Sequence, residues 1–263
     1  MISFKPFKST YLFLFLLLNF QLISYAQSSE LKIETAAART DLYVNLLKGK
    51  NIAVVANQTS VIFKEIYKKK QEARHLVDSL LTLGIEVKKV FAPEHGFRGK
   101  ADAGEVVKDG FDTKTGLQII SLYGKNKKPS ATQLKGIDIV VFDIQDVGAR
   151  FYTYISSLHY VMEACAEAGI QVIILDRPNP NSHYIDGPVL EAKHTSFVGM
   201  HKVPVVYGMT IGEYGKMING EKWLKNGIQC DLKVIPLKNY NHQTKYSLPI
   251  KPSPNLPNDK SIN

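Results

Sequence analysis

The chain has 263 residues, of which 44% are hydrophobic, and it carries a formal net charge of +9 at pH 7. That hydrophobic content is ordinary for a globular core. The positive charge comes largely from short lysine runs without zinc-finger spacing or an RNA-recognition signature, so nucleic-acid binding is not supported. A basic surface suits an anionic partner of another kind.

The N-terminus has the layout of a secretory signal peptide. Lys5 and Lys8 precede an apolar run over residues 11–23, and Ser24 and Ala26 place small side chains at the −3 and −1 positions of a cleavage site. The apolar run is short for a membrane span, although an uncleaved anchor is the alternative. We therefore expect export to the periplasm or the extracellular space, with no stable membrane anchor after cleavage.

Apolar runs and helical spacing predict an alternation of strands and helices. In chain order, the predicted elements are strand Asn51–Ala56, helix His75–Leu83, strands Val87–Ala92, Gln118–Leu122 and Ile137–Ile144, helix Ile155–Ala168, strand Gln171–Leu175, the partly helical segment Met209–Trp223 and strand Leu232–Ile235. Continuous apolar strands that alternate with helices imply a parallel sheet covered on both faces. The expected fold is a doubly wound, Rossmann-like α/β domain with a mostly parallel sheet.

Polar side chains follow the predicted strands where each of them ends. Because ligands of open α/β sheets bind beyond the carboxyl ends of the strands, we expect these side chains to line one edge. The candidates are Glu94, His95, Arg98, Glu105, Asp143, Gln145, Asp146, Arg150, Tyr152, Tyr154, Asp176 and Arg177. Glycines interrupt the loop after Glu94, and glycine lets a backbone turn sharply and a ligand come close.

This mixture of side chains suits a sugar. Carboxylates accept hydroxyl hydrogen bonds and supply acid or base groups, tyrosines stack on pyranose faces, and arginines bind a carboxylate in a bidentate way. Structural roles are the alternatives: Asp143 and Asp176 as caps that hold the next loop, and Tyr152 and Tyr154 as half-buried aromatic residues. A Glu94–Arg98 surface ion pair is a further alternative.

Other chemistries find little support in the sequence. No Gly-x-Gly-x-x-Gly turn follows the first strand and no Walker A loop occurs, so we predict no cofactor. No Gly-x-Ser-x-Gly elbow is present, and His95 with Glu94 or Asp146 lacks the spacing of a zinc site, so we predict no metal. Cys165 and Cys230 are compatible either with a disulfide or with two buried thiols.

The motifs at these positions resemble the NamZ family of exo-β-N-acetylmuramidases. The matching runs are Phe91–Gly99, Ala103–Glu105, Ser121–Gly124, Phe142–Tyr154, Asp176–Pro180, Asp186–Pro188, Ser196–Gly199, Pro204 and Tyr207–Glu213. They are long, they occur in order, and the resemblance extends from about Ile52 to Pro257.

The resemblance implies an exported glycosidase of peptidoglycan turnover, which releases N-acetylmuramic acid from the non-reducing end of cell-wall fragments. It also implies a Rossmann-like domain and a smaller C-terminal domain with the active cleft between them. Family members continue well past Ser253–Pro257, so we expect a signal peptide over 1–26, the α/β domain over 27–200 and an incomplete second domain over 201–263. The expected partners are muramyl saccharides derived from peptidoglycan.

The resemblance implies Glu94 as the catalytic residue, and we expect it to protonate the glycosidic oxygen. Asp143, Asp146 and Glu105 are candidates for a second carboxylate that acts as base or nucleophile, and the substrate's acetamido group is another. Arg98, Arg150 or Arg177 is expected to bind the lactyl carboxylate of muramic acid. His95, Glu105, Gln145, Tyr152, Tyr154 and Asp176 complete the predicted substrate contacts. The alternatives are a non-catalytic saccharide-binding protein of the cell wall and another hydrolase, an esterase or an amidase.

Overall fold

The computed structural model describes residues 32–66, 70–99 and 108–262. Contacts divide the chain into two units, Met1–Lys32 and Ile33–Asn263, and the fold presented below is that of the second unit. The predicted signal segment over 1–26 lies outside the described residues, and so does Glu105. Within the described ranges, no helix has the length and apolarity that crossing a bilayer requires.

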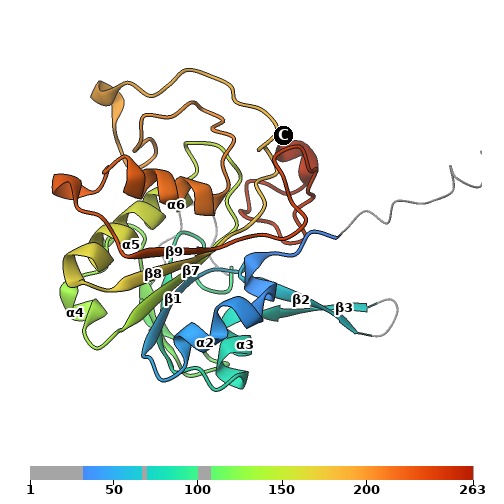
Figure 1. The fold of residues 1–263 in the computed structure, drawn as a ribbon, viewed down its shortest axis with the longest axis vertical. Helices are drawn as coiled ribbons and strands as arrows, with labels where there is room; N and C mark the ends of the chain where they lie inside the picture. The colour runs from blue at the N-terminus through green and yellow to red at the C-terminus, as the bar shows by residue number, and fades with distance from the viewer. Residues whose placement is uncertain (1–31, 67–69, 100–107, 263) are drawn as a thin grey trace, which may run out of the picture. The chain divides into compact units, whose positions relative to one another are not determined.

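Seven strands of the described chain form one sheet in the order β5-β6-β4-β1-β7-β8-β9 (Figure 1). Every neighbouring pair is parallel except β5 and β6, which are antiparallel. The strands are β1 (Ile52–Ala56), β4 (Val87–Ala92), β5 (Gly110–Phe111), β6 (Gln118–Ser121), β7 (Ile139–Asp143), β8 (Gln171–Leu175) and β9 (Leu232–Ile235). The six predicted strands are therefore confirmed, and so is the mostly parallel, Rossmann-like architecture.

Helices cover both faces of the sheet, because alternate residues of each strand point to opposite sides. On β1, Ala53 and Val55 pack in the cluster that includes α5 and α6, whereas Val54 packs in the cluster that includes α3. Figure 1 shows α5 and α6 on one side of the sheet and α2 and α3 on the other. The helices are α2 (Val44–Leu47), α3 (Leu76–Thr82), α4 (Ala131–Leu134), α5 (Tyr154–Ala168) and α6 (Ile211–Gly220), with short 3₁₀ turns η1 (Ala36–Ala38), η2 (Thr40–Leu42), η3 (Ala192–His194), η4 (Lys225–Gly227) and η5 (Asp259–Ser261).

A two-stranded antiparallel hairpin, β2 (Val61–Ile66) with β3 (Lys70–His75), was not predicted from the sequence. It follows the carboxyl end of β1 and leads directly into α3, whose first turn is capped by the His75 side chain accepting from the Val77 amide. The predicted helix over His75–Leu83 is thus present, one residue shorter at each end. Gly84 follows it with φ of 74°, a left-handed conformation suited to glycine.

The predicted boundary of the α/β domain at residue 200 does not coincide with the end of the sheet. β9 lies at residues 232–235 and pairs in parallel with β8, from Val172 opposite Leu232 to Leu175 opposite Ile235. α6 also follows residue 200 and packs on the same face as α5. The sheet therefore extends about 35 residues beyond the boundary that we predicted.

Candidate active site

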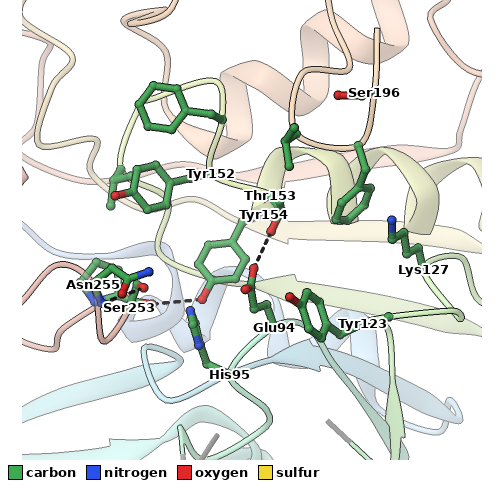
Figure 2. Close-up of a pocket in the computed structure, with 16 residues that line it drawn as sticks. Glu94, His95, Tyr123, Lys127, Tyr152, Thr153, Tyr154, Ser196, Ser253 and Asn255 are labelled. Atoms are coloured by element: carbon green, nitrogen blue, oxygen red, sulfur yellow. Dashed lines mark hydrogen bonds between the residues drawn. The ribbon is translucent and has the colours of Figure 1, made fainter. Parts of the chain in front are cut away.

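A cavity of 780 Å³ opens at the carboxyl edge of the parallel strands. Its lining comes from loops that are far apart in the sequence, namely those after β4, β6 and β7, the 196–198 loop and the segment from 252 to 255 (Figure 2). The lining residues are Glu94, His95, Tyr123, Gly124, Lys127, Val147, Phe151, Tyr152, Thr153, Tyr154, Ser196, Phe197, Val198, Pro252, Ser253 and Asn255. Four of the predicted site residues are among them: Glu94, His95, Tyr152 and Tyr154.

Glu94 enters the cavity because β4 ends at Ala92 and the buried Pro93 cannot continue its ladder. The Gly96 amide donates to the Pro93 carbonyl at 3.0 Å, which closes a tight turn around Glu94 and His95. The Thr153 hydroxyl donates to Glu94 Oε2 at 3.2 Å, and Tyr123 lies beside the same carboxylate (Figure 2). Burial and the nearby Glu94 carboxylate raise the pKa of Tyr123. Among the described residues that line the cavity, Glu94 is the only carboxylate.

His95 adopts a left-handed backbone conformation, with φ of 71°, although it is not glycine. Such a conformation costs free energy for a residue with a Cβ, and strain of this kind clusters at functional sites. The side chain is buried, and its Nδ1 atom has no hydrogen-bond partner among the described residues. The loop therefore holds an imidazole with an unused polar atom at the wall of the cavity.

Aromatic rings form much of the remaining wall. Tyr123, Phe151, Tyr152, Tyr154 and Phe197 all line the cavity. The Tyr154 hydroxyl donates to the Pro252 carbonyl at 3.0 Å, so this ring also holds the 252–255 segment in place. Burial raises the pKa of Tyr152 and that of Tyr154, so both hydroxyls are protonated at neutral pH. Neutral rings of this kind present flat faces on which a pyranose ring stacks.

Arg98 does not line this cavity, and its contact with substrate stays a prediction. Its guanidinium makes a bidentate pair with Asp112, at 2.8 and 2.7 Å, and a further contact of 3.0 Å with Asp78. Hydrogen bonds from Arg98 lower the pKa of Asp112 well below its ordinary value. The two carboxylates engage the guanidinium outside the cavity lining.

Asp143 and Arg177 form a buried ion pair at the strand ends, and their roles in catalysis and substrate binding stay predictions. Arg177 Nε donates to Asp143 Oδ1 at 2.6 Å and Nη2 donates to Oδ2 at 2.9 Å. Arg177 Nη2 also donates to the Val61 carbonyl at 3.3 Å, so the pair connects β7 to the start of the hairpin. Both side chains are almost fully shielded, at 0% and 3% exposure, and neither lines the cavity.

Asp146 and Gln145 lie in the loop after β7 but do not line the cavity. Asp146 Oδ2 accepts from the Gly148 amide at 2.8 Å and from the Tyr207 hydroxyl. Burial raises the pKa of Asp146 to about 6, against the opposing effect of these hydrogen bonds. Gln145 Nε2 donates to the Asp146 and Pro178 carbonyls, so it ties two strand-end loops together.

Asp176 and Arg150 also hold loops and do not line the cavity, and their contacts with substrate stay predictions. Asp176 accepts from the Gly212 amide at 2.8 Å and from the Thr210 hydroxyl at 2.9 Å, and thereby fixes the first turn of α6. This is the capping role that the sequence offered as the alternative. Arg150 Nη1 donates to the Pro188 carbonyl at 2.9 Å and to that of Val203, so it anchors the segment before α6.

Sequence reasoning did not assign several residues that line the cavity, above all Tyr123, Lys127, Thr153 and Phe197. Tyr123, Thr153 and Phe197 stand within the motifs that carried the family resemblance, and this was the available signal. Lys127 belongs to a lysine run that resembles a solvated face, so nothing in the sequence marked it as a cavity residue. Among the described residues, no cluster of three or more His, Cys, Asp or Glu side chains could hold a metal ion. Cys165 and Cys230 are both buried free thiols.

Comparisons with known proteins agree with this architecture. The chain is 43% identical over 225 residues to the peptidoglycan beta-N-acetylmuramidase NamZ of Bacillus subtilis (strain 168), a match that covers 83% of this chain and 51% of that protein. The chain therefore spans about half the length of this curated relative.

Crystal structures of two DUF1343 family proteins from Bacteroides fragilis NCTC 9343 resemble the fold, and each alignment covers 88% of this chain. One is 48% identical with a TM-score of 0.76 over 59% of its own length, and the other is 34% identical with a TM-score of 0.74 over 57%. Residues 52–260 match the family described as exo-beta-N-acetylmuramidase NamZ, N-terminal. A match over most of the sequence, on a sheet and cavity built as above, means that this chain belongs to the NamZ family.

Proposed function

We propose that this chain carries the catalytic cavity of an exported exo-β-N-acetylmuramidase, which releases N-acetylmuramic acid from the non-reducing end of peptidoglycan fragments. Membership of the NamZ family and the name of the Bacillus relative support this function. The observation that carries it is the position of Glu94, a half-buried carboxyl group in an aromatic-walled cavity at the carboxyl edge of the sheet.

Glu94 is the general acid in this proposal. Glycoside hydrolysis needs a carboxylic acid within hydrogen-bond reach of the leaving oxygen, because the departing sugar must be protonated. The Thr153 hydroxyl, 3.2 Å from Glu94 Oε2, fixes the direction in which the carboxyl group points. The tyrosine rings stack on the sugar and exclude water from the bond that breaks.

The second group of the reaction stays a prediction, with Asp143, Asp146, Glu105 and the substrate's acetamido group as its candidates. Asp143 is paired with Arg177, and Asp146 Oδ2 accepts from Gly148 and Tyr207, whereas Asp146 Oδ1 has no partner among the described residues. Neither aspartate lines the cavity. Glu105→Gln stops turnover if that carboxylate acts, whereas replacing the acetamido group by a free amine on the substrate stops it if the acetamido oxygen attacks.

The central test is Glu94→Gln, assayed with a chromogenic β-N-acetylmuramide. Loss of a general acid is expected to reduce the rate by about 10²–10⁴ while leaving the fold intact. Glu86→Gln is a matched control, because Glu86 is an exposed glutamate that pairs with Lys88 outside the cavity lining. Near-normal turnover by a folded Glu94→Gln variant would remove Glu94 from the mechanism.

The same assay separates the two rival functions. A saccharide-binding protein without catalysis would bind N-acetylmuramic acid but release no chromophore from the muramide. An esterase or amidase would leave the muramide intact and cleave an ester or amide substrate instead. Release from the muramide and not from the matching glucosaminide is the result expected for the proposed enzyme.

A further inference from the structure

The described wall of the cavity contains a lysine and none of the three arginines predicted to bind the lactyl carboxylate. Arg98, Arg150 and Arg177 are all engaged with carboxylates or carbonyl oxygens outside the cavity lining. Among the described residues, Lys127 is the only lysine or arginine that lines the cavity. Any anionic group on the bound sugar would therefore meet one cationic side chain of the described wall.

The loop that carries Lys127 is held by contacts of the residues on either side of it. Asn126 Nδ2 donates to the Ser121 carbonyl at 3.0 Å at the end of β6. Lys128 pairs with Glu163 and with Glu167 of α5, at 2.7 Å in each case. Between these two anchors, the half-buried Lys127 side chain projects toward the cavity (Figure 2).

The ammonium group of Lys127 lies over the ring of Phe197. Lys127 Nζ lies 4.3 Å from the centroid of the Phe197 ring, within the range of a cation–π contact. The ring is itself fixed, because the Ser156 hydroxyl donates to the Phe197 carbonyl at 2.7 Å and Tyr160 stacks on the ring. Lys127 has no carboxylate partner among the described residues, in contrast to Lys128, so its charge is available to a ligand.

We infer that Lys127 binds the lactyl carboxylate of the substrate and thereby selects N-acetylmuramic acid over N-acetylglucosamine. The two sugars differ only in the lactyl ether, which carries a carboxylate that glucosamine lacks. This inference rests on the proposed function, because it assigns one contact between the same cavity and the proposed substrate. Lysine acts as a point charge toward such an anion and needs no bidentate geometry.

The test measures binding, which does not depend on turnover. Titrations of the full chain with N-acetylmuramic acid and with N-acetylglucosamine are compared for the wild type, Lys127→Met and Lys127→Arg. Lys127→Met should lose about tenfold in affinity for N-acetylmuramic acid, as expected for one charge-assisted hydrogen bond, with affinity for N-acetylglucosamine unchanged. Lys127→Arg should keep the preference, and added salt should weaken the binding of the anionic sugar alone.

Lys125→Met is the matched control, because Lys125 is an exposed lysine of the same loop that does not line the cavity. It should bind both sugars as the wild type does. Equal losses for both sugars in Lys127→Met, or no loss for either, would overturn the inference while leaving a saccharide site in place. A wild type that binds neither sugar would overturn the proposed function together with the inference.

Discussion

Buried charge at the strand ends holds the loops that surround the cavity. Asp143 and Arg177 pair with each other, while Asp146 and Asp176 accept hydrogen bonds from amides and hydroxyls of the loops they meet. A buried charge needs such partners, because removal from water is costly for an ion. These residues therefore shape the cavity without facing it, whereas Glu94 faces it.

Arg177→Met should destabilise the protein strongly. It leaves the Asp143 carboxylate buried at 0% exposure without its counter-ion, and breaking a buried pair in this way costs about 3–5 kcal/mol. Urea unfolding measures the change in the free energy of unfolding. Lys193→Met breaks the exposed pair with Glu191 and should change stability by less than about 1 kcal/mol. Similar small losses in both variants would mean that the buried pair contributes little.

The sequence indicated which residues stand at the sheet edge, but not the direction in which each side chain points. Glu94 follows the end of β4 and Asp143 ends β7, but of the two carboxylates only Asp143 is paired with Arg177. That pair joins positions 34 residues apart, one at the end of β7 and the other in the loop after β8, so no local pattern contains it. The capping alternative for Asp176 was available from the sequence because a polar residue after a buried strand commonly holds the next loop.

The first turn of α6 packs tightly against Asp176, which follows β8, and against Val234 of β9. A Cβ atom on Gly212 would lie 2.6 Å from Asp176 Cγ and 2.7 Å from Val234 Cγ1, closer than side chains pack. The first turn of α6 can therefore receive the Asp176 carboxylate only because residue 212 has no side chain. The glycine fixes where the helix begins.

Gly212→Ala should destabilise the protein by about 1–3 kcal/mol, the usual cost of overpacking a filled site. Gly220→Ala, in the last turn of the same helix, meets nothing within 4 Å and should stabilise by up to about 1 kcal/mol, because alanine favours helix. Thermal or urea unfolding of the two variants gives the comparison. A neutral Gly212→Ala would mean that α6 moves away from the sheet without penalty.

Periodicity predicted the strands of the large sheet well, because buried parallel strands are apolar throughout. The hairpin of β2 and β3 was not predicted because its second strand, Lys-Gln-Glu-Ala-Arg-His, contains no apolar run. Its charged residues resembled a solvated segment. The strand pairing that makes it a hairpin is a contact between segments, which a pattern within either segment does not show.

The raised pKa of Asp146 makes the stability of the whole protein depend on pH. Burial raises this pKa to about 6, above its ordinary value of 3.8, so the folded protein holds the proton more tightly than the unfolded chain. Between pH 4 and pH 6 the unfolded chain therefore binds fewer protons at this site. The contribution of Asp146 to stability is greatest below pH 4 and declines as pH rises through 6.

Asp146→Asn removes this dependence while keeping an oxygen that can accept from Tyr207 and Gly148. The free energy of unfolding of Asp146→Asn, relative to the wild type, should rise by about 2–3 kcal/mol between pH 4 and pH 7. Urea unfolding of both proteins at a series of pH values measures the difference. A difference that stays constant across this range would contradict a raised pKa at Asp146.

The segment 252–255, which forms one wall of the cavity, follows the sheet in the sequence. The strands that place Glu94 and Tyr154 precede Leu175, but the cavity closes only when the Pro252 carbonyl accepts from Tyr154 and Gln58. On a chain synthesised from its N-terminus, the sheet can begin to form before that segment has emerged. Completion of the cavity therefore comes after the core, so a partly synthesised chain has its sheet before it has the wall that residues 252–255 supply.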